Sequence, residues 1–365
     1  MKVAFMLGSL NRGGLETLLL DVCKSAKQEG LDCIGIHRKG GKYTDDFYDA
    51  IDMYQLSPYG CRYITYIIKL RKLLKQHNIT AVHAQQELDA LYALLATMGT
   101  NIKVVQTFHG YDYNKNFISK FLIWLTILFC NRNFFVSNSQ REYYSKKYSL
   151  LPKNKLYVLY NGINFSKLSS LSKRDRYIQG KKLNFGTVGN FVPGREQSSL
   201  CRFLKILRDS GVDFDFSFVG ARNEQEPWRF DDCVEYCRQN KLEDCVHFLG
   251  SRGDVPQLLS EWDAFVYSTD HDTFGIAVIE AIASGLPVFV NDWIVMKEIT
   301  EDGALSTIYK TKDEKDLLEK FIVFLQNRDS YYDKAYQSAI IVREKFSIKS
   351  HIKQLQKYLL EISNK

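Results

Sequence analysis

Short apolar runs alternate with amphipathic helical stretches along this chain, and the whole alternation occurs twice in 365 residues. Val3–Leu7 is a continuous apolar run, and apolar residues at helical spacing follow it. Continuous apolar runs are typical of strands buried on both faces, as in a parallel sheet covered by helices. In the first half we predict strands at Val3–Leu7, Ile34–Ile36, Ala81–His83, Val104–Phe108 and Phe134–Val136, and a helix at Tyr63–Gln76.

The second copy of the pattern begins at Leu183 and predicts another α/β domain of the same kind. Its expected strands are Leu183–Val188, Phe214–Val219, Val246–Leu249, Ala264–Tyr267, Val288–Val290 and Ser306–Tyr309, followed by helices at Lys315–Gln326, Tyr332–Lys345 and Ile348–Ile362. The polar stretch 168–182 lacks periodicity and is interpreted as a linker. We therefore predict two doubly wound parallel-sheet domains that divide near residues 165–182 and face each other across a cleft.

Charge is distributed unevenly between the two halves. Residues 1–165 carry 21 Lys and Arg against 12 Asp and Glu, whereas residues 166–365 carry 28 against 30. A basic first half indicates either a solubilising surface or an anionic partner, such as a phosphorylated acceptor, a membrane surface or nucleic acid. No helix-turn-helix, RNA-recognition or zinc-finger pattern occurs, so we expect no nucleic-acid partner.

The N-terminus is interpreted as a first core strand and not as a cleavable signal. The longest apolar stretch, Phe121–Cys130, is too short to span a bilayer, which takes about 20 residues. The eight cysteines lack the spacing of a metal site and are expected to be reduced. We expect a cytoplasmic protein, either free or at the inner face of the membrane.

Two loops in the first half follow predicted strands. The loop 8–14 ends in Asn-Arg-Gly-Gly, which lets a ligand approach the backbone at a helix N-terminus, although a plain tight turn would look the same. His109 follows the strand Val104–Phe108 and is followed by Gly110. A histidine at the carboxyl end of a strand can bind a substrate hydroxyl or phosphate, or can be structural.

Two further loops lie in the second half. In the loop 189–196, Arg195 can bind phosphate or form a surface ion pair. The segment 270–281 has an acidic loop with Asp272, a glycine that opens an apolar helix, and Glu280 within that helix. A loop carboxylate can bind sugar hydroxyls, the helix N-terminus can hold a diphosphate, and the helix carboxylate can bridge vicinal hydroxyls.

Together these motifs resemble the GT-B glycosyltransferases, and most closely the retaining glycosyltransferase family 4. The resemblance covers nearly the whole chain, through GGLET (13–17), FHG (108–110), VSNS (136–139), YNGIN (160–164), GNFVPGRE (189–196), HFLGSRGDVPQLL (247–259) and DTFGIAVIEAIASGLPV (272–288). The last segment resembles the family signature of two glutamates separated by seven residues. It implies an acceptor-side domain at 1–165, a nucleotide-sugar donor domain at 166–347, and a C-terminal helix, 348–365, that packs back on the first domain.

The resemblance also implies roles for single residues. Asp272 would hold the transferred sugar, Arg195 the diphosphate, and His109 would line the sugar site. Glu280 would bind the ribose of the donor. Other donor-binding residues would be Gly189, Asn190, Phe274, Gly275, Ile276 and Gly14, and Gly13 and Glu16 would lie on the acceptor side. No metal is implied, because Asp272 of Asp270-His271-Asp272 is assigned to the sugar.

Three positions depart from the family pattern. Asp272 stands where the family has Glu, Asn190 where it often has Arg, and Arg195 where it has Lys. The implied activity is retaining transfer from a UDP- or GDP-sugar to a hydroxyl of a saccharide or lipid-linked acceptor, in surface polysaccharide or glycolipid biosynthesis, without an obligatory cofactor. The alternatives are a nucleotide-sugar-binding protein without turnover, and a GT-B epimerase or inverting transferase.

The stretch 117–135 is rich in Phe, Leu and Ile, with Trp124 among them and Lys115, Lys120 and Arg132 around or within it. A basic apolar surface would suit docking at a membrane that carries the acceptor. A buried core helix is the alternative.

Overall fold

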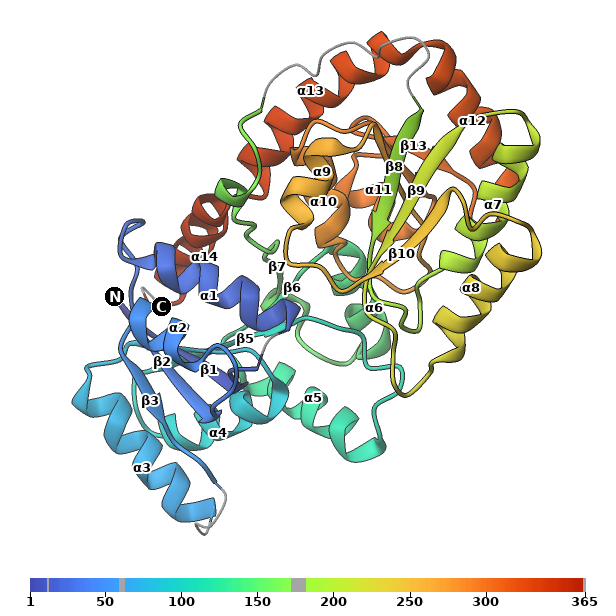
Figure 1. The fold of residues 1–365 in the computed structure, drawn as a ribbon. Helices are drawn as coiled ribbons and strands as arrows, with labels where there is room; N and C mark the ends of the chain where they lie inside the picture. The colour runs from blue at the N-terminus through green and yellow to red at the C-terminus, as the bar shows by residue number, and fades with distance from the viewer. Residues whose placement is uncertain (12, 59–62, 172–181, 364–365) are drawn as a thin grey trace. The chain divides into compact units, whose positions relative to one another are not determined.

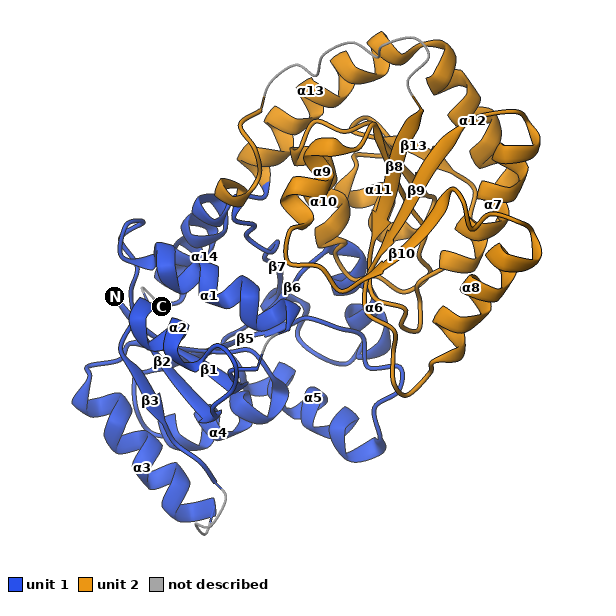
Figure 2. Cartoon of the chain, in the orientation of Figure 1, with its two compact units in different colours: residues 1–164, 346–365 blue, residues 165–345 orange. Residues whose placement is uncertain are grey.

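The computed structural model of the protein describes residues 1–11, 13–58, 63–171 and 182–363. These residues form two compact units: unit 1 is 1–164 with 346–365, and unit 2 is 165–345 (Figure 2). Arg12 of the first glycine loop, Cys61 and most of the predicted linker, 172–181, lie outside the described residues. Each unit contains one sheet with helices on both faces (Figure 1).

Unit 1 is built on a seven-stranded sheet in the order β3-β2-β1-β4-β5-β6-β7, in which all pairs are parallel. Its strands are β1 (Lys2–Ser9), β2 (Asp32–Lys39), β3 (Met53–Gln55), β4 (Ala81–Ala84), β5 (Lys103–Phe108), β6 (Arg132–Phe135) and β7 (Leu156–Val158). Its helices are α1 (Gly14–Ala26), α2 (Thr44–Ala50), α3 (Tyr63–Gln76), α4 (Glu87–Thr97), α5 (Phe117–Phe129), α6 (Asn138–Lys147) and α14 (Ile348–Ser363), with a 3-10 turn at Lys153–Lys155.

Alternate residues of β1 supply two different cores. Val3 and Phe5 pack in the cluster that contains α1 and α14, whereas Ala4 and Met6 pack in the cluster that contains α3 and α4. Successive side chains of a strand point to opposite faces, so a continuous apolar run is what a sheet covered on both faces requires. Unit 1 therefore has α1 and α14 on one face of its sheet and α3 and α4 on the other (Figure 1).

Unit 2 repeats this arrangement on a six-stranded sheet in the order β10-β9-β8-β11-β12-β13. Its strands are β8 (Leu183–Val188), β9 (Phe214–Val219), β10 (Val246–Gly250), β11 (Ala264–Tyr267), β12 (Val288–Asn291) and β13 (Thr307–Tyr309), all parallel. Its helices are α7 (Gln197–Asp209), α8 (Trp228–Gln239), α9 (Val255–Glu261), α10 (Ile276–Ala283), α11 (Ile294–Ile299), α12 (Glu314–Gln326) and α13 (Arg328–Lys345), with a 3-10 turn at Phe165–Lys167. Its core is rich in phenylalanine.

The predicted α/β class with two doubly wound parallel sheets is confirmed. Strands β3 and β7, each of three residues at an edge of the sheet, are not predicted from the sequence, whereas β13, which has the same length, is. Strand order reverses between β1 and β4 in unit 1, and between β8 and β11 in unit 2. In such sheets ligands bind beyond the carboxyl ends of the strands at this reversal, which is called the topological switch point.

Candidate functional site at the switch point of unit 2

Two of the predicted site loops meet at the switch point of unit 2. The loop after β8 carries Arg195, and the loop after the neighbouring strand β11 carries Asp272. Backbone bonds join the loops: Arg195 forms an antiparallel bridge with Thr269, and Glu196 N donates to Ser268 O at 3.1 Å. Their relative position is thus held by the backbone of both loops.

Arg195, Asp272 and Tyr267 form one hydrogen-bonded cluster. Arg195 Nη1 donates to Asp272 Oδ2 at 2.5 Å and also to the Tyr267 hydroxyl. The Tyr267 hydroxyl donates to the same Asp272 oxygen at 2.6 Å. The guanidinium lies over the Tyr267 ring, 5.1 Å from its centroid. A cation and an anion that the family resemblance assigns to different parts of a substrate are therefore in direct contact.

Burial makes this contact strong. The side chains of Arg195 and Asp272 are 23% and 13% exposed. Burial opposes the charge of Arg195, but the nearby Tyr267 and Asp272 reverse that effect and raise the pKa of the guanidinium. Burial is also the main cause that raises the pKa of Tyr267 well above its ordinary value, so the phenol stays protonated and donates. The cluster is thus an ion pair of Arg195 with Asp272, with the neutral Tyr267 hydroxyl beside it.

Gly275 links this cluster to the start of α10. Its φ of +80° is the left-handed conformation that glycine adopts without strain, and it is the cap residue of the helix. A Cβ at this position would lie 2.8 Å from Met296 Cε and 3.7 Å from Asp272 Oδ2. The first N–H groups of α10 have no partner within the helix, and they begin next to the Asp272 carboxylate.

Phe274, Ile276 and Glu280 complete this segment. Phe274 is 3% exposed, so it contributes its backbone and anchors the loop in the core. Ile276 is the first residue of α10, and Glu280 lies one turn further along, half-buried, on a helix whose other residues are apolar. The structure therefore places Asp272, Gly275 and Glu280 in one continuous loop and helix.

Gly189 and Asn190 lie at the end of β8. Gln197 Nε2 donates to the carbonyl oxygens of both residues at 3.2 Å. Asn190 Oδ1 accepts from Ala221 N at 2.8 Å, so this side chain ties its loop to the loop after β9. A Cβ at Gly189 would lie 3.5 Å from Arg195 Nε. The backbone of Gly189 is thus adjacent to the guanidinium, and Asn190 adds no charge there.

Asp270 and Asp272 have different partners although they are two residues apart. Asp270 lies 3.7 Å from Lys312 Nζ, which also lies 3.5 Å from Glu196. Burial, and next a hydrogen bond with Asp270, raises the pKa of Glu196. Among the described residues there is no group of three or more His, Cys, Asp and Glu side chains that could hold a metal ion.

In unit 1, His109 follows β5 at the carboxyl edge of the sheet. Its Nε2 is 2.9 Å from Gln85 Oε1, at the end of the neighbouring strand β4. Burial, with a smaller effect of His351, lowers the pKa of His109 to about 4. The imidazole is therefore neutral at physiological pH, and its Nε2–H donates to Gln85.

Gly13 and Glu16 are brought together at the start of α1. A Cβ on Gly13 would lie 2.5 Å from Glu16 Oε2, so the carboxylate folds over the glycine. A Cβ on the next residue, Gly14, would meet nothing within 4 Å. Gly13 O accepts from Thr17 N at 3.0 Å and from Thr17 Oγ1 at 2.8 Å, which holds this turn in place.

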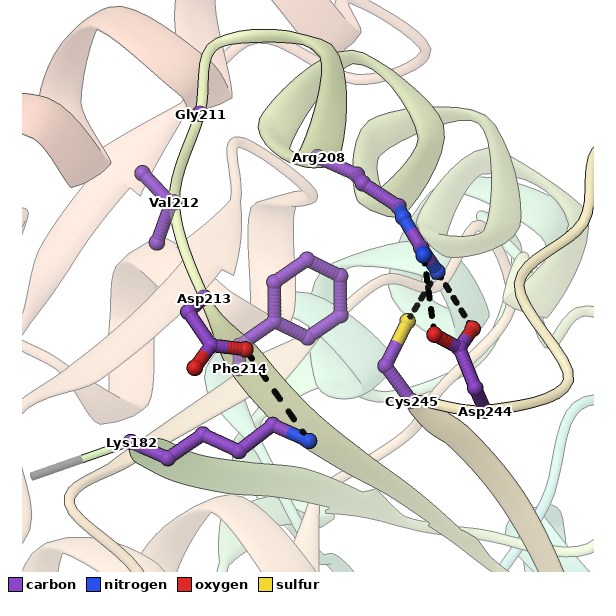
Figure 3. A pocket seen from close by; sticks show the side chains of 8 residues that line it. All are labelled: Lys182, Arg208, Gly211, Val212, Asp213, Phe214, Asp244 and Cys245. Carbon is purple, nitrogen blue, oxygen red and sulfur yellow. Dashed lines mark hydrogen bonds and ion pairs between the residues drawn. The ribbon is translucent and has the colours of Figure 1, made fainter.

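A cavity of about 240 Å³ in unit 2 lies at the opposite edge of the sheet (Figure 3). The cavity lies at the amino ends of β8, β9 and β10. Its lining includes the residue that directly precedes each of these strands: Lys182, Asp213 and Cys245. The charged groups in it are paired, as Arg208 with Asp244 and Lys182 with Asp213 at 4.0 Å. The cavity is separate from the switch-point cluster.

Sequence reasoning does not single out three residues of these clusters. Tyr267 is expected only as the end of a strand, although a hydroxyl at the end of an apolar run is a signal that could have indicated it. Trp293, whose Nε1 donates to Asp272 O at 3.1 Å, and Gln85 carry no local signal. Both residues follow strands, β12 and β4, and their partners are distant in the sequence.

Comparison with known proteins agrees with this architecture. Residues 12–167 match the model of Glycosyltransferase Family 4, and residues 171–340 match that of Glycosyl transferases group 1. A UDP-Gal:alpha-D-GlcNAc-diphosphoundecaprenol alpha-1,3-galactosyltransferase of Escherichia coli is 25% identical over 76% of this chain and 76% of its own length. The O-antigen biosynthesis glycosyltransferase WclY of Escherichia coli is 21% identical over 90% of this chain and 94% of its own.

A solved structure shares the fold over the whole chain. HepE of Anabaena, in complex with UDP and glucose, has a TM-score of 0.82 at 17% identity and covers 99% of this chain and 100% of that one. Both halves match glycosyltransferase models, and both sheets have the doubly wound topology of the GT-B fold. The chain therefore belongs to the GT-B glycosyltransferases, in glycosyltransferase family 4 with its glycosyl transferases group 1 domain.

Proposed function

We propose that the protein is a retaining glycosyltransferase that moves a sugar from a nucleotide diphosphate sugar to a hydroxyl of a saccharide or lipid-linked acceptor. The observation that carries this proposal is the contact of Arg195 with Asp272 beside Gly275 and the start of α10. The switch point of unit 2 thereby brings together a cation that can bind phosphate, a carboxylate that can bind a sugar, and a helix N-terminus.

In this proposal unit 2 holds the donor. Arg195 and the first N–H groups of α10 bind the diphosphate, and they stabilise the negative charge that develops as it leaves. Asp272 accepts hydrogen bonds from the transferred sugar, and Glu280 accepts those of the ribose. The backbone of Gly189, Asn190, Phe274, Gly275 and Ile276 lines the site, and Gly14 of unit 1 is a further donor contact. No metal is required, because the protein supplies the positive charge itself.

Donor binding requires Arg195 to leave Asp272, at least in part. Arg195 and Asp272 form an ion pair of 2.5 Å. In the proposed complex the diphosphate of the nucleotide sugar binds Arg195, and the sugar hydroxyls bind Asp272, so both side chains keep a hydrogen-bonding partner. The Tyr267 hydroxyl, which bonds to both residues, can remain with either of them.

Unit 1 is proposed to hold the acceptor. Gly13 and Glu16 form the acceptor side at the start of α1, where the Glu16 carboxylate can accept a bond from a hydroxyl. Neutral His109 at the end of β5, whose Nε2 contacts Gln85, is proposed to line the sugar site. Relatives named for diphosphoundecaprenol substrates and for O-antigen biosynthesis support a lipid-linked acceptor in surface polysaccharide or glycolipid assembly. We propose that the protein acts on the cytoplasmic side of a membrane.

A donor screen tests this function. The chain is incubated with UDP-, GDP-, ADP- and TDP-sugars, and thermal stabilisation and release of nucleoside diphosphate are measured. We expect one donor to stabilise the protein and to be slowly hydrolysed, and both effects to vanish in Arg195→Ala and Glu280→Ala. Stabilisation without release, even with added lipid-linked acceptors, would instead support a nucleotide-sugar-binding protein without turnover. The anomeric configuration of a product separates retention from inversion.

A further inference from the structure

Arg38 reaches across the topological switch point of unit 1. It lies near the end of β2, and its Nε donates to Asp89 Oδ1 of α4 at 2.8 Å. Its Nη2 donates at 3.0 Å to Oε1 of Gln86, the residue that caps α4 after β4. Strand β1 lies between β2 and β4 in the sheet, so the arginine side chain passes over the carboxyl end of β1. The guanidinium is therefore at the place where sheets of this kind bind ligands.

Gly8, near the end of β1, leaves room for this arrangement. A Cβ at this position would lie 2.8 Å from Arg38 Nη2 and 2.6 Å from Gln86 Oε1. A larger residue would therefore push these groups away from the strand end. The guanidinium and the amide thus meet directly above the backbone of the central strand.

Asp89 holds the inner edge of the guanidinium. Its side chain is fully buried, whereas 12% of the Arg38 side chain is exposed. The carboxylate accepts from Nε, which is only one of several N–H donors on an arginine. The buried partner therefore orients the guanidinium and leaves its outer edge, Nη1 and Nη2, for other groups.

The outer edge of the guanidinium offers donors and no acceptor. Nη1 of Arg38 makes no hydrogen bond within the described parts of the chain, and Nη2 makes the one to Gln86. Because arginine only donates, that bond takes the amide oxygen of the exposed Gln86, and the Nε2 group that remains is a donor as well. An arginine with a purely structural role uses such donors within the protein, as Arg71 Nη1 does with the carbonyl oxygens of Ala96 and Met98.

A ligand that fits this edge supplies acceptors and negative charge. A phosphate group does both, and its geometry suits a guanidinium. A sugar hydroxyl fits less well, because it adds a donor of its own. The excess of Lys and Arg in residues 1–165 has the matching sign. Unit 2 has a comparable arrangement, in which Arg195 lies at the switch point with Asp272 as its partner.

We propose that Arg38 and Gln86 bind a phosphate group of the acceptor at the switch point of unit 1. Asp89 is the positioning residue that orients the guanidinium, and Gly8 keeps the place above β1 open. The assignment to the acceptor rests on the proposed function, which it narrows to acceptors that carry a phosphate. The affinity for phosphate itself does not depend on catalysis.

Calorimetric titration with inorganic pyrophosphate tests the site. The reference chain is Arg195→Ala, in which the proposed donor site lacks its cation. We expect this chain to bind pyrophosphate with an affinity that falls as the ionic strength rises. Addition of Gln86→Glu should weaken binding at least about tenfold, because the new carboxylate accepts from Arg38 in place of the ligand and repels the anion. Gln86 is exposed, so this variant should fold.

A double substitution tests the arginine without leaving a buried charge. Arg38→Gln/Asp89→Asn removes both partners of the ion pair, so neither is left unpaired. In the Arg195→Ala chain it should weaken pyrophosphate binding by a similar factor, and thermal unfolding shows whether it is folded. Arg71→Gln is the matched control, because Arg71 is a hydrogen-bonded arginine of unit 1 at the other end of α4, and it should leave binding unchanged.

Two results would overturn the site. One is an equal affinity of the Arg195→Ala chain for pyrophosphate with and without Gln86→Glu. The other is the loss of all pyrophosphate binding when Arg195 alone is replaced, because unit 1 would then bind no phosphate.

Thermal stabilisation by nucleotide sugars distinguishes the phosphate of the acceptor from that of the donor. With Arg195 intact, Gln86→Glu should leave stabilisation by the donor unchanged. A loss as large as that in Arg195→Ala would assign the phosphate to the donor and overturn the acceptor site. Pyrophosphate binding that depends on Gln86, together with no response to any nucleotide sugar, would contradict the proposed function and leave the phosphate site intact.

Discussion

Arg195 and Asp272, 77 residues apart in sequence, share a hydrogen bond of 2.5 Å beyond the carboxyl ends of β8 and β11. The Tyr267 hydroxyl is hydrogen-bonded to both side chains. Substitutions of either residue should therefore change donor binding, protein stability and turnover.

Replacement of Arg195 by Ala should lower kcat by about 10²–10³-fold, because one preorganised cation at the leaving diphosphate is lost. Arg195→Lys should retain most of the activity, because Lys is the usual residue of the family at this position. Release of nucleoside diphosphate measures both. Arg222→Ala is the matched control: Arg222 also lies in unit 2 and is ion-paired, with Asp231, on an exposed surface. A similar loss in Arg222→Ala would show that the effect is not specific to the site.

Asp272→Asn should reduce stability by about 1–3 kcal/mol, because it leaves a largely buried guanidinium without its counter-charge. Chemical denaturation measures this difference. Asp272→Glu keeps the charge and should restore most of the stability, with an altered preference among donor sugars because the carboxylate is one methylene further out. An Asn variant as stable as the parent chain would mean that the pair does not form in solution.

Gly275→Ala should destabilise the protein by about 1–3 kcal/mol, through backbone strain at φ +80° and the close approach of Met296 Cε at 2.8 Å. Gly211→Ala separates the two causes, because Gly211 has φ +85° and nothing within 4 Å of an added Cβ. The Gly275 variant should therefore lose more stability in thermal unfolding, and it alone should weaken nucleotide-sugar binding. Equal losses of stability in the two variants would mean that backbone strain alone accounts for the effect, without a contribution from Met296.

Gly13→Ala should displace the Glu16 carboxylate, which lies 2.5 Å from the added Cβ, and so raise the KM for the acceptor. Gly14→Ala has room for its methyl group, because an added Cβ has no neighbour within 4 Å. A change in donor KM caused by Gly14→Ala would therefore report that the bound donor approaches this position. If neither variant changes either KM, the start of α1 is not a substrate contact.

Stability should fall in acid below about pH 6.5, partly through His109. Burial lowers its pKa to about 4, so between these values the unfolded chain binds a proton that the folded chain does not. The pKa values of His83 and His351 are also lowered by burial, and they act in the same direction. Melting temperatures at about pH 7.5 and about pH 5 measure the effect. His109→Gln should reduce it, and an unchanged pH dependence in this variant would contradict the assignment.

Much of the architecture follows from local pattern. Continuous apolar runs such as Val3–Leu7 and Leu183–Val188 can be satisfied only by a sheet covered on both faces, and helical spacing such as that of Tyr63–Gln76 identifies the connections. The two copies of the pattern therefore determine two doubly wound sheets. They also place the loops with Gly13, His109, Arg195 and Asp272 after strands, where a ligand site is expected.

The short edge strands and the partners within each loop depend on tertiary structure. Strands β3 and β7 are missed by the sequence pattern, and each is defined by its hydrogen bonds with the neighbouring strand, β2 or β6. The contact of Arg195 with Asp272 depends on the pairing of β8 with β11, which no local pattern contains. Tyr267, Gln85 and Trp293 join their partners for the same reason. The sequence by itself determined which residues end strands, and only the order of the strands in the sheet decided which of them meet, because that order is set by packing of the whole unit.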